Sequence, residues 1–478
     1  MEKHIQELIN AFEIHFDCKV NSVNRLAESG SNRRYYRLIG ENGSAIACIG
    51  AQKAENKAFV AIAKNLKNAN INVPEVYFFS KNQYCYLQQD LGNISLADAV
   101  DDGCLSGHYS VAHKTLLKKT IAELAHIQCS GAQNMDWSVC YPQSNFDENM
   151  IAWDLNYFKY CFLKLSGLEI DEVALQADFD MLSTHLLSVP SDCFMFRDFQ
   201  SRNVMLLDNE LYFIDFQGAR RGPVHYDLAS FVWQAKMHYS AKFKDSLIEC
   251  YLTALERYRP VDRQAFYAQF LHFSLFRCLQ VLGAYGFRGL YEGKEHFLKS
   301  ISSALDNLLI ISKSLGSQFP YIRKLAKSLT KDNRFVYDEE YFDGLTVEVY
   351  SFSYKKGLPR DLSGNGGGYV FDCRAINNPG RYSIYAYSSG LDQNVVDFLQ
   401  QDGSSETFLE PIKLLAESHV SKYLERGFSH LMFSFGCTGG QHRSVYCAHS
   451  LAGYLQSKFS NVRVIENHLQ QPYWRKKQ

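Results

Sequence analysis

Residues 194–216, FMFRDFQSRNVMLLDNELYFIDF, hold two carboxylates and an amide at a spacing that suits phosphoryl transfer. An apolar strand ends at Asp198, a loop runs to Asn203, and a second strand ends at Asp215 after a turn. Transfer of a phosphoryl group from ATP needs a carboxylate that takes the proton of the attacking hydroxyl. It also needs an amide and a second carboxylate that hold Mg²⁺ against the phosphates. We therefore predict Asp198 as the catalytic base and Asn203 and Asp215 as metal ligands; the alternative is that these are turn-forming residues beside strands.

Two stretches around this centre resemble the aminoglycoside phosphotransferase and choline kinase superfamily, namely residues 197–203 (RDFQSRN) and 214–231 (IDFQGARRGPVHYDLASF). More narrowly, they resemble the cell-wall amino-sugar kinases that phosphorylate N-acetylmuramate and N-acetylglucosamine at the anomeric position. Residues 276–288 are similar to a helix of that group. The resemblance covers roughly the first 320 residues and implies a two-lobed protein-kinase-like fold that uses ATP and Mg²⁺. It implies a structural role for Asp227, which would anchor the catalytic loop from the helix that follows that loop.

The nucleotide side of this centre is expected in residues 28–37 (ESGSNRRYYR), where the family covers the phosphates. Backbone N–H groups can face phosphate oxygens there, and Arg33 or Arg34 can add positive charge. The adenine side is expected at the hinge, residues 88–92 (QQDLG). The residues that we predict to bind the cofactor ATP are Ser29, Gly30, Ser31, Arg33 and Asp90.

One departure from the kinase pattern concerns the third strand of the N-terminal lobe. Kinases carry a lysine there, whereas this strand reads Ala47-Cys48-Ile49. Lys53 comes later and stands beside Glu55. The sequence therefore leaves the cation that clamps the nucleotide phosphates unassigned.

A second constellation lies in residues 430–446, HLMFSFGCTGGQHRSVY, where a glycine-containing loop joins an apolar strand to a helix. Backbone N–H groups at a helix N-terminus bind anions, and the helix dipole adds to this attraction. An arginine can bind a phosphate through two parallel contacts. The residues that we predict to bind an anion are Cys437, Thr438, Gly439, Gly440, His442, Arg443 and Ser444.

Two interpretations compete for this loop. The string fits C-x5-R-S, the loop of cysteine-dependent phosphatases, in which Cys437 would be a thiolate nucleophile. The loop together with residues 369–379 (YVFDCRAINNP) and 389–392 (SGLD) resembles instead the C-terminal domain of RapZ, an adaptor that binds small RNA and senses an amino-sugar phosphate. We favour the second interpretation because the sequence places no Asp as the general acid of a phosphatase.

This second resemblance spans roughly residues 344–478. It departs from RapZ after Asn378-Pro379, where RapZ proteins carry a histidine and this chain reads Gly-Arg-Tyr. The nucleotide-binding half of RapZ is absent. It implies a sugar phosphate as effector and RNA as an alternative partner, with candidate RNA contacts at Arg475, Lys476 and Lys477 after Trp474.

The elements that must position these residues form two groups, and we predict an α+β protein in which a bilobal kinase-like domain precedes a separate α/β domain. Strand-like runs at 44–50 and 84–91 precede helical patterns at 114–129, 266–285 and 297–315. Later strands at 345–354, 368–376, 430–436 and 462–466 alternate with helices at 407–425 and 442–458. We place the domains at residues 1–335 and 341–478, with a polar linker around 330–343.

Composition limits the classes of function. The 478 residues carry 50 Lys and Arg against 51 Asp and Glu, so a strongly basic nucleic-acid coat is excluded. Residues 341–478 hold 14 basic and 12 acidic residues, which favours small-molecule sensing over RNA binding. The start has no signal-peptide pattern and no apolar run is long enough for a membrane span, so we expect a cytoplasmic protein without a membrane partner. The 13 cysteines include no C-x-x-C pair, and we expect no structural zinc.

These observations together predict an ATP-dependent sugar kinase joined to a sensor domain. A kinase for another hydroxyl-bearing small molecule is the nearest alternative. An RNA-binding regulator with a degenerate kinase is an alternative of a different class. The intact set of Asp198, Asn203 and Asp215 argues against degeneracy.

Overall fold

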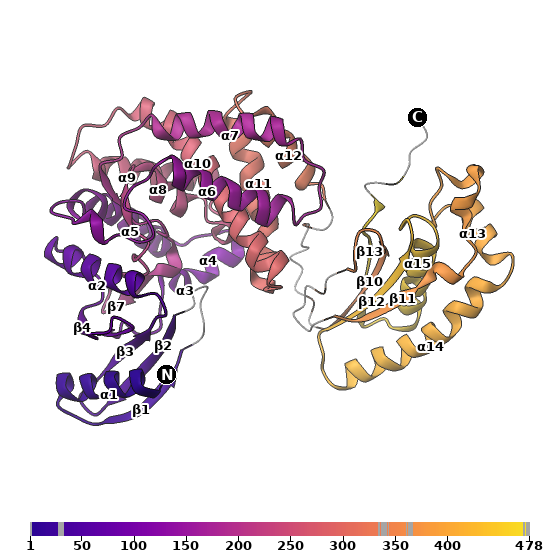
Figure 1. The fold of residues 1–478 in the computed structure, drawn as a ribbon, viewed down its shortest axis with the longest axis horizontal. Coiled ribbons are helices and arrows are strands. Elements are labelled where there is room, and N and C mark those ends of the chain that lie inside the picture. Colours follow the sequence, from indigo (N-terminus) through magenta and orange to yellow (C-terminus); the bar gives the residue numbers. More distant parts are fainter. Residues whose placement is uncertain are drawn as a thin grey trace. The chain divides into compact units, whose positions relative to one another are not determined.

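The structure is a computed structural model, and it describes residues 2–26, 33–332, 335, 342, 344–359, 361, 367–471 and 474. The chain divides into two compact units: Met1–Phe287 with Ser300–Lys331, and Arg288–Lys299 with Asp332–Gln478 (Figure 1). The first unit combines an antiparallel sheet with a large helical lobe, and the second contains a parallel sheet with helices. This arrangement confirms the predicted α+β class.

The N-terminal lobe is a five-stranded antiparallel sheet in the order β1-β2-β3-β5-β4. Its strands are β1 (Val20–Arg25), β2 (Arg34–Gly40), β3 (Gly43–Ile49), β4 (Val76–Phe79) and β5 (Cys85–Gln89). Helix α1 (Glu2–Phe16) packs on this sheet because Leu8 and Phe12, one turn apart, face the apolar side chains of β2, β3 and β5. The predicted strands at 44–50 and 84–91 correspond to β3 and β5.

Helix α2 (Lys53–Asn68) follows β3 and links the sheet to the catalytic region. Its Phe59 ring stacks on Tyr86 of β5 at a centroid distance of 4.7 Å and on Phe216 at 4.8 Å. Aromatic stacking of this kind adds to the stabilisation from apolar burial. Helix α2 is therefore packed directly against the segment that follows Asp215.

The helical lobe surrounds two short hairpin-like ladders that form the catalytic region. Strand β6 (Cys193–Met195) pairs with β9 (Arg220–Gly222), and β7 (Val204–Leu207) pairs with β8 (Glu210–Phe213). The turn between β7 and β8 has positive φ at both Asp208 and Asn209, as a two-residue type I′ turn requires. The helices are α3 (Leu96–Ala99), α4 (Asp101–Ser106), α5 (Val111–Ser130), α6 (Glu148–Phe158), α7 (Glu172–Leu187), α8 (His225–Val232), α9 (Ala241–Leu255), α10 (Arg263–Tyr285), α11 (Glu295–Ser314) and α12 (Pro320–Leu329).

Side-chain caps define where several of these helices begin. Ser110, Asp147, Asp171, Ser240 and Asp262 each accept a hydrogen bond from the backbone N–H three residues later. Such a cap typically contributes about 1 kcal/mol to helix stability. The short 3-10 and π turns of the lobe are η1 (Trp137–Val139), η2 (Lys159–Leu163), η3 (Ser201–Asn203), η4 (Ala235–Met237) and η5 (Gly286–Tyr291).

The second unit is built on a four-stranded parallel sheet in the order β11-β12-β10-β13. Its strands are β10 (Leu345–Ser353), β11 (Tyr369–Asp372), β12 (His430–Cys437) and β13 (Val462–His468). Its helices are α13 (Gln393–Gln400), α14 (Ser404–Glu425) and α15 (Arg443–Lys458), and its 3-10 turns are η6 (Cys373–Ala375), η7 (Pro379–Arg381) and η8 (Ser383–Tyr385). The apolar faces of the strands and helices form one core. Because all four strands are parallel, their carboxyl ends lie at one edge, where ligands bind in such sheets.

Strand β11 is shorter than the predicted strand at 368–376. It ends at Asp372, whose side chain accepts the backbone N–H of Arg374 at 2.9 Å and caps turn η6. An Asp side chain that bonds to the backbone two residues later favours a turn over a strand. Within the described ranges, no helix combines the length and the apolar character that crossing a membrane requires.

Candidate active site

The catalytic loop begins directly after β6, and a buried carboxylate accepts two backbone N–H groups at its start. Asp227, in the first turn of α8, accepts the backbone N–H of Phe196 at 2.6 Å and of Arg197 at 2.9 Å. Gln128 of α5 donates to the same carboxylate at 3.4 Å. Burial raises the pKa of Asp227 to about 7, although the two backbone hydrogen bonds lower it. Asp227 thus connects α8 to the loop that carries Asp198.

Arg197 turns its side chain away from the loop into a buried ion pair. Its guanidinium binds both carboxylate oxygens of Asp154 on α6, at 2.6 and 2.7 Å, and donates to the hydroxyl of Tyr226 at 2.8 Å. Its backbone φ is +83°, which costs a non-glycine residue free energy. A bidentate arginine–carboxylate pair has strict geometry, so this pair determines the direction in which the chain leaves β6.

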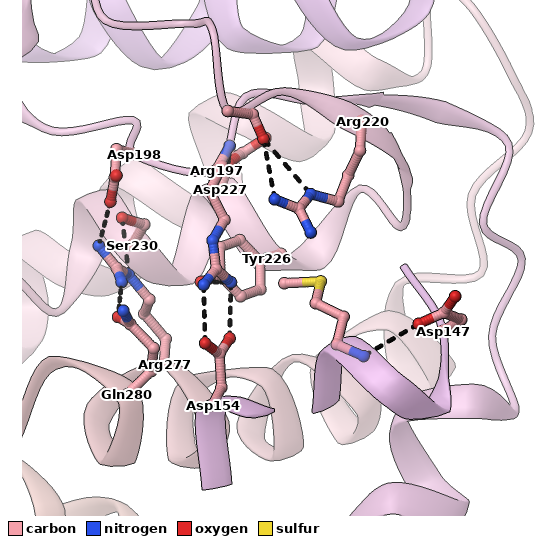
Figure 2. Close-up of polar contacts among 12 residues, drawn as sticks. Asp147, Asp154, Arg197, Asp198, Arg220, Tyr226, Asp227, Ser230, Arg277 and Gln280 are labelled. Atoms are coloured by element: carbon pink, nitrogen blue, oxygen red, sulfur yellow. Dashed lines mark hydrogen bonds and ion pairs between the residues drawn. The ribbon is translucent and has the colours of Figure 1, made fainter. Parts of the chain in front are cut away.

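Asp198 is bound by an arginine that the sequence did not reveal. The Arg277 guanidinium of α10 lies 3.1 Å from Oδ1 of Asp198, donates to Ser230 at 3.0 Å, and also donates to Gln280 (Figure 2). The Arg277 side chain is 4% exposed and the Asp198 side chain 43% exposed, so the carboxylate is the accessible partner. Burial alone would raise the pKa of Asp198, but the positive charge of Arg277, with those of Arg197 and Arg202, leaves it below its ordinary value. Asp198 is therefore ionised at neutral pH, as a proton acceptor must be.

Two hydrogen bonds connect the three predicted catalytic and metal-binding residues. Asn203 donates its side-chain N–H to the backbone carbonyl of Asp198 at 2.8 Å. The backbone N–H of Ile214 donates to the carbonyl of Asn203 at 3.0 Å, which places Asp215 beside the loop. The structure therefore brings Asp198, Asn203 and Asp215 to one end of the β6–β9 and β7–β8 ladders.

The oxygens of this group suit a hard divalent cation. Oδ1 of Asp215 accepts from Arg33 at 3.2 Å and from Gln217 at 2.9 Å. Oδ2 of Asp215 and Oδ1 of Asn203 have no hydrogen-bond partner in the part of the chain that the structure describes. Carboxylate and amide oxygens are the ligands that Mg²⁺ prefers, so these two atoms fit that ion.

Arg33 places a cation where the third strand has none. It lies just before β2, is 4% exposed, and its Nη2 is 3.2 Å from Asp215 and 3.5 Å from Glu55 of α2. Burial is the largest single effect on the pKa of Arg33, and it lowers this pKa. The attraction of nearby groups, among them Asp215 and Glu55, outweighs burial and raises the pKa above its ordinary value. In kinases a strand lysine pairs with a helix glutamate beside the phosphates. Arg33 likewise lies between a helix glutamate and the candidate metal-binding aspartate, although it comes from the segment before β2.

The other predicted nucleotide-binding residues are placed as follows. Ser29, Gly30 and Ser31 lie outside the described residues. Asp90 directs its carboxylate at Arg37, with Oδ2 2.7 Å from Nε, and also accepts the backbone N–H of Gly92 at 3.0 Å. The Asp90 side chain therefore binds other residues of the N-terminal lobe, and only the backbone groups of this segment could contact a nucleotide.

The loop after β12 has a buried half and an exposed half. The Cys437 sulfur accepts the backbone N–H of Gly440 at 3.2 Å and lies 3.1 Å from the Ser444 hydroxyl. Gly440 has φ +69°, and a Cβ there would lie 2.4 Å from the Gln470 side chain, so glycine is required. Thr438 and Gly439 are exposed, and a Cβ on Gly439 would meet no atom within 4 Å. The exposed half of the loop is thus the part that a ligand can reach.

Arg443, predicted to bind the anion, is buried and donates to the protein backbone. Its Nη1 bonds to the carbonyls of Arg374 at 2.8 Å and Ile376 at 3.0 Å, while Nε is buried with no hydrogen-bond partner among the described residues. His442 is partly buried, with Nε2 3.0 Å from the carbonyl of Tyr385. Arg443 therefore connects α15 to the segment after β11.

The tail next to this loop was predicted as a candidate RNA contact. Trp474 donates its indole N–H to the carbonyl of Gly440 at 3.3 Å and lies against His468. Arg475, Lys476 and Lys477 lie outside the described residues.

Sequence reasoning missed the partners that come from distant elements. Asp154, Gln128 and Arg277 contact the catalytic loop from α6, α5 and α10. The signals for Arg277 were a charged residue within the apolar run of residues 266–285 and the resemblance of residues 276–288 to a helix of the amino-sugar kinases. A charge in a buried helical face implies a partner, but the sequence does not say which.

Comparisons with known proteins identify both parts of the chain. Residues 22–261 match the family model of the phosphotransferase enzyme family, and residues 345–470 match the RapZ C-terminal domain. A nucleotide-binding protein of Ruegeria sp. (strain TM1040) is 39% identical over 120 residues, which are 25% of this chain and 38% of that protein. A nucleotide-binding protein of Staphylococcus aureus (strain MRSA252) is 31% identical over 174 residues, 36% of this chain and 56% of that protein. The chain thus spans about half or less of the length of these curated relatives.

Solved structures with a similar fold include two phosphotransferases. The choline kinase LicA from Streptococcus pneumoniae has a TM-score of 0.45 at 17% identity and covers 66% of this chain and 99% of its own. A thermostable mutant of aminoglycoside phosphotransferase APH(4)-Ia has a TM-score of 0.44 at 13% identity and covers 65% of this chain and 100% of its own. On the family match over residues 22–261, the chain belongs to the phosphotransferase enzyme family, and it carries a RapZ C-terminal domain after the phosphotransferase region.

Proposed function

We propose that this protein is an ATP-dependent sugar kinase that phosphorylates N-acetylmuramate or N-acetylglucosamine at the anomeric hydroxyl, as a step in cell-wall recycling. The observation that carries the proposal is the convergence of Asp198, Asn203 and Asp215 at the ends of paired strands. The choice of sugar rests on the resemblance of residues 197–203 and 214–231 to the anomeric amino-sugar kinases. The family membership supports transfer to a small molecule.

In the proposed reaction the chain positions the acceptor hydroxyl and takes its proton. The hydroxyl oxygen forms a bond to the γ-phosphorus, the bond to the bridging oxygen breaks, and ADP leaves. The proton passes to a carboxylate oxygen of Asp198, whose pKa Arg277 helps to keep low. Mg²⁺, when bound by Asn203 and Asp215, would supply charge neutralisation of the phosphates. The guanidinium of Arg33 would face the same phosphates from the N-terminal lobe.

Incubation of the protein with ATP, Mg²⁺ and each sugar, followed by product identification by NMR, tests the proposal. A sugar 1-phosphate is expected from at least one of the two sugars. If the folded protein binds ATP but forms no 1-phosphate with either sugar, the proposed substrates are wrong. A wider panel of small hydroxyl compounds would then identify the acceptor.

The role of Asp198 has a matched control in the same segment. Asp198→Asn should abolish turnover while ATP binding persists, because the amide cannot accept the proton. Asp208→Asn makes the same chemical change at the exposed type I′ turn, where Asn is equally suited, and should leave turnover unchanged. An active Asp198→Asn protein would remove Asp198 from its proposed role.

A second proposed function concerns the RapZ C-terminal domain, whose exposed Thr438 and Gly439 lie in the loop between β12 and α15. We propose that this loop binds an amino-sugar phosphate that modulates the kinase. Calorimetry with glucosamine 6-phosphate on wild type, Gly439→Asp and Gly439→Asn tests it, since a Cβ at this position would meet no atom within 4 Å. A carboxylate about 4 Å from a bound phosphate costs about 1–4 kcal/mol, so Gly439→Asp should bind about fivefold more weakly or worse. Equal heats for all three proteins would reject this site.

A further inference from the structure

Three side chains of different chemistry converge in the N-terminal lobe, away from the phosphotransferase site. His4 and Glu7 lie one turn apart on α1, so they share a face of that helix. Cys85 is the first residue of β5. One ligand atom from each residue lies within 4.8 Å of the other two, and the Cys85 sulfur is 3.8 Å from a carboxylate oxygen of Glu7. Residues 78 positions apart in the chain therefore present a nitrogen, an oxygen and a sulfur to one point.

The three side chains are shielded from solvent to different degrees. Cys85 is fully buried, and His4 and Glu7 are partly buried. The Nδ1 atom of His4 is shielded from solvent and has no hydrogen-bond partner among the residues that the structure describes. A buried polar atom left unpaired is destabilising, and native proteins contain few of them. The His4 ring thus carries a shielded, unpaired nitrogen close to the carboxylate and the thiol.

We propose that His4, Glu7 and Cys85 bind a divalent transition metal of the zinc class, with solvent in the fourth coordination position. Imidazole, carboxylate and thiolate are the ligands that zinc takes in proteins, whereas Mg²⁺ and Ca²⁺ prefer oxygen ligands alone. When the metal–sulfur bond forms, the Cys85 thiol releases its proton to the buffer and no electron is transferred. The separation of the ligand atoms, at most 4.8 Å, requires only small side-chain movements, because ligands of one tetrahedral ion are roughly 3–4 Å apart for bonds of about 2.0–2.3 Å.

The position of the site gives it a structural role in the lobe. Helix α1 packs on the sheet through Leu8 and Phe12, which lie C-terminal to the proposed ligands. A metal at His4 and Glu7 would tie the first two turns of α1 to the start of β5, whose other end leads to Asp90. Because a metal that binds only the folded state stabilises it by mass action, the melting temperature of the lobe should rise with metal concentration.

The test uses the full chain, stripped with a chelator and titrated with Co²⁺ and then with Zn²⁺ against a chromophoric competitor. Wild type should bind one equivalent of Co²⁺ and show the thiolate-to-cobalt charge-transfer band together with intense tetrahedral d–d bands. Cys85→Ser should lose the charge-transfer band, and His4→Gln should weaken binding at least about tenfold, as loss of one direct ligand predicts. Cys18→Ser, at a partly buried cysteine of the same lobe, is the matched control and should behave as wild type.

The outcomes decide the proposal even if one variant folds poorly. His4→Gln alters a partly buried residue near the start of α1, so it can be measured if Cys85→Ser fails to fold. Absence of a charge-transfer band in wild type, or the same band in both Cys85→Ser and His4→Gln, would overturn the site. Equal weakening in Cys18→Ser would also overturn it, because the effect would then not be specific to these ligands.

Discussion

Replacement of Arg33 by methionine tests whether this residue supplies the cation that the third strand lacks. Its Nη2 atom lies 3.2 Å from Asp215 and 3.5 Å from Glu55, and the side chain is 4% exposed. Methionine has a similar length and no charge, so it removes both ion pairs while filling much of the space. The two carboxylates would then face each other, and the proposed ATP site would lose its buried cation.

The expected magnitude follows from the burial of the three groups. A hydrogen bond to a charged group contributes about 1.5–3 kcal/mol. Glu55 and Asp215 are 25% and 37% exposed, so solvent screening favours the lower part of that range. Because about 1.4 kcal/mol corresponds to a factor of ten in rate, kcat/KM for ATP should fall by about 10- to 40-fold. Arg33→Lys keeps the positive charge but replaces the guanidinium by an ammonium group on a different side chain, so it should be impaired less than Arg33→Met.

The assay combines turnover with binding of a non-hydrolysable ATP analogue, measured by calorimetry. A double-mutant cycle with Glu55→Gln should give a coupling energy of about 0.5–3 kcal/mol if the pair acts as a unit. Arg34→Met, which removes the same charge from an exposed neighbouring residue, is the control and should be close to wild type. If Arg33→Met binds the analogue and turns over as wild type does, the reasoning about the displaced cation is wrong.

Three further perturbations have defined outcomes. Asp227→Asn cannot accept both backbone N–H groups of the catalytic loop as well as a carboxylate does, so urea unfolding should show a loss of about 1–3 kcal/mol. Burial raises the pKa of Asp227 from 3.8 to about 7, so between pH 3.8 and about pH 7 the folded protein holds a proton that the unfolded chain has released. Stability should therefore fall as pH rises through this window. The fall should be smaller in Asp227→Asn. Burial would raise the pKa of Asp198 and the charge of Arg277 helps to keep it low, so Arg277→Gln should move the acidic limb of the kcat/KM profile to higher pH. Arg443→Met loses hydrogen bonds to two backbone carbonyls and should lower the melting temperature of the RapZ C-terminal domain.

The sequence was sufficient where local pattern determines local structure. Helical periodicity predicted residues 266–285, which form α10 from Arg263 to Tyr285. The apolar run at 430–436 corresponds to β12, His430–Cys437, and the turn at Asp208 and Asn209 separates β7 from β8 as expected. These features follow from side-chain period and turn chemistry, both of which act over a few residues.

Contacts between distant segments could not be predicted in the same way. No local rule indicates that Arg277 meets Asp198 across 79 residues, or that Arg33 meets Asp215 across 182. The direction in which a side chain points is equally hard to predict from the sequence. The position of Arg443 in the loop suggests phosphate binding, but its Nη1 donates to backbone carbonyls. The proposed metal site is also invisible to a search for spaced cysteines, because one helix turn supplies two ligands and a distant strand supplies the third.

The strained backbone of the active site explains why so many of these distant contacts meet there. Arg197 and Asp215 both have positive φ, +83° and +68°, and each lies two residues after the end of a short strand. Such conformations cost about 1–3 kcal/mol each and persist only when surrounding contacts determine them. Asp227 and Asp154 bind the backbone and side chain of Arg197, and Arg33 binds the Asp215 side chain. The contacts of these buried charged residues thus offset the free-energy cost of the two sharp backbone turns. The two turns direct the Asp198 and Asp215 carboxylates to the same edge.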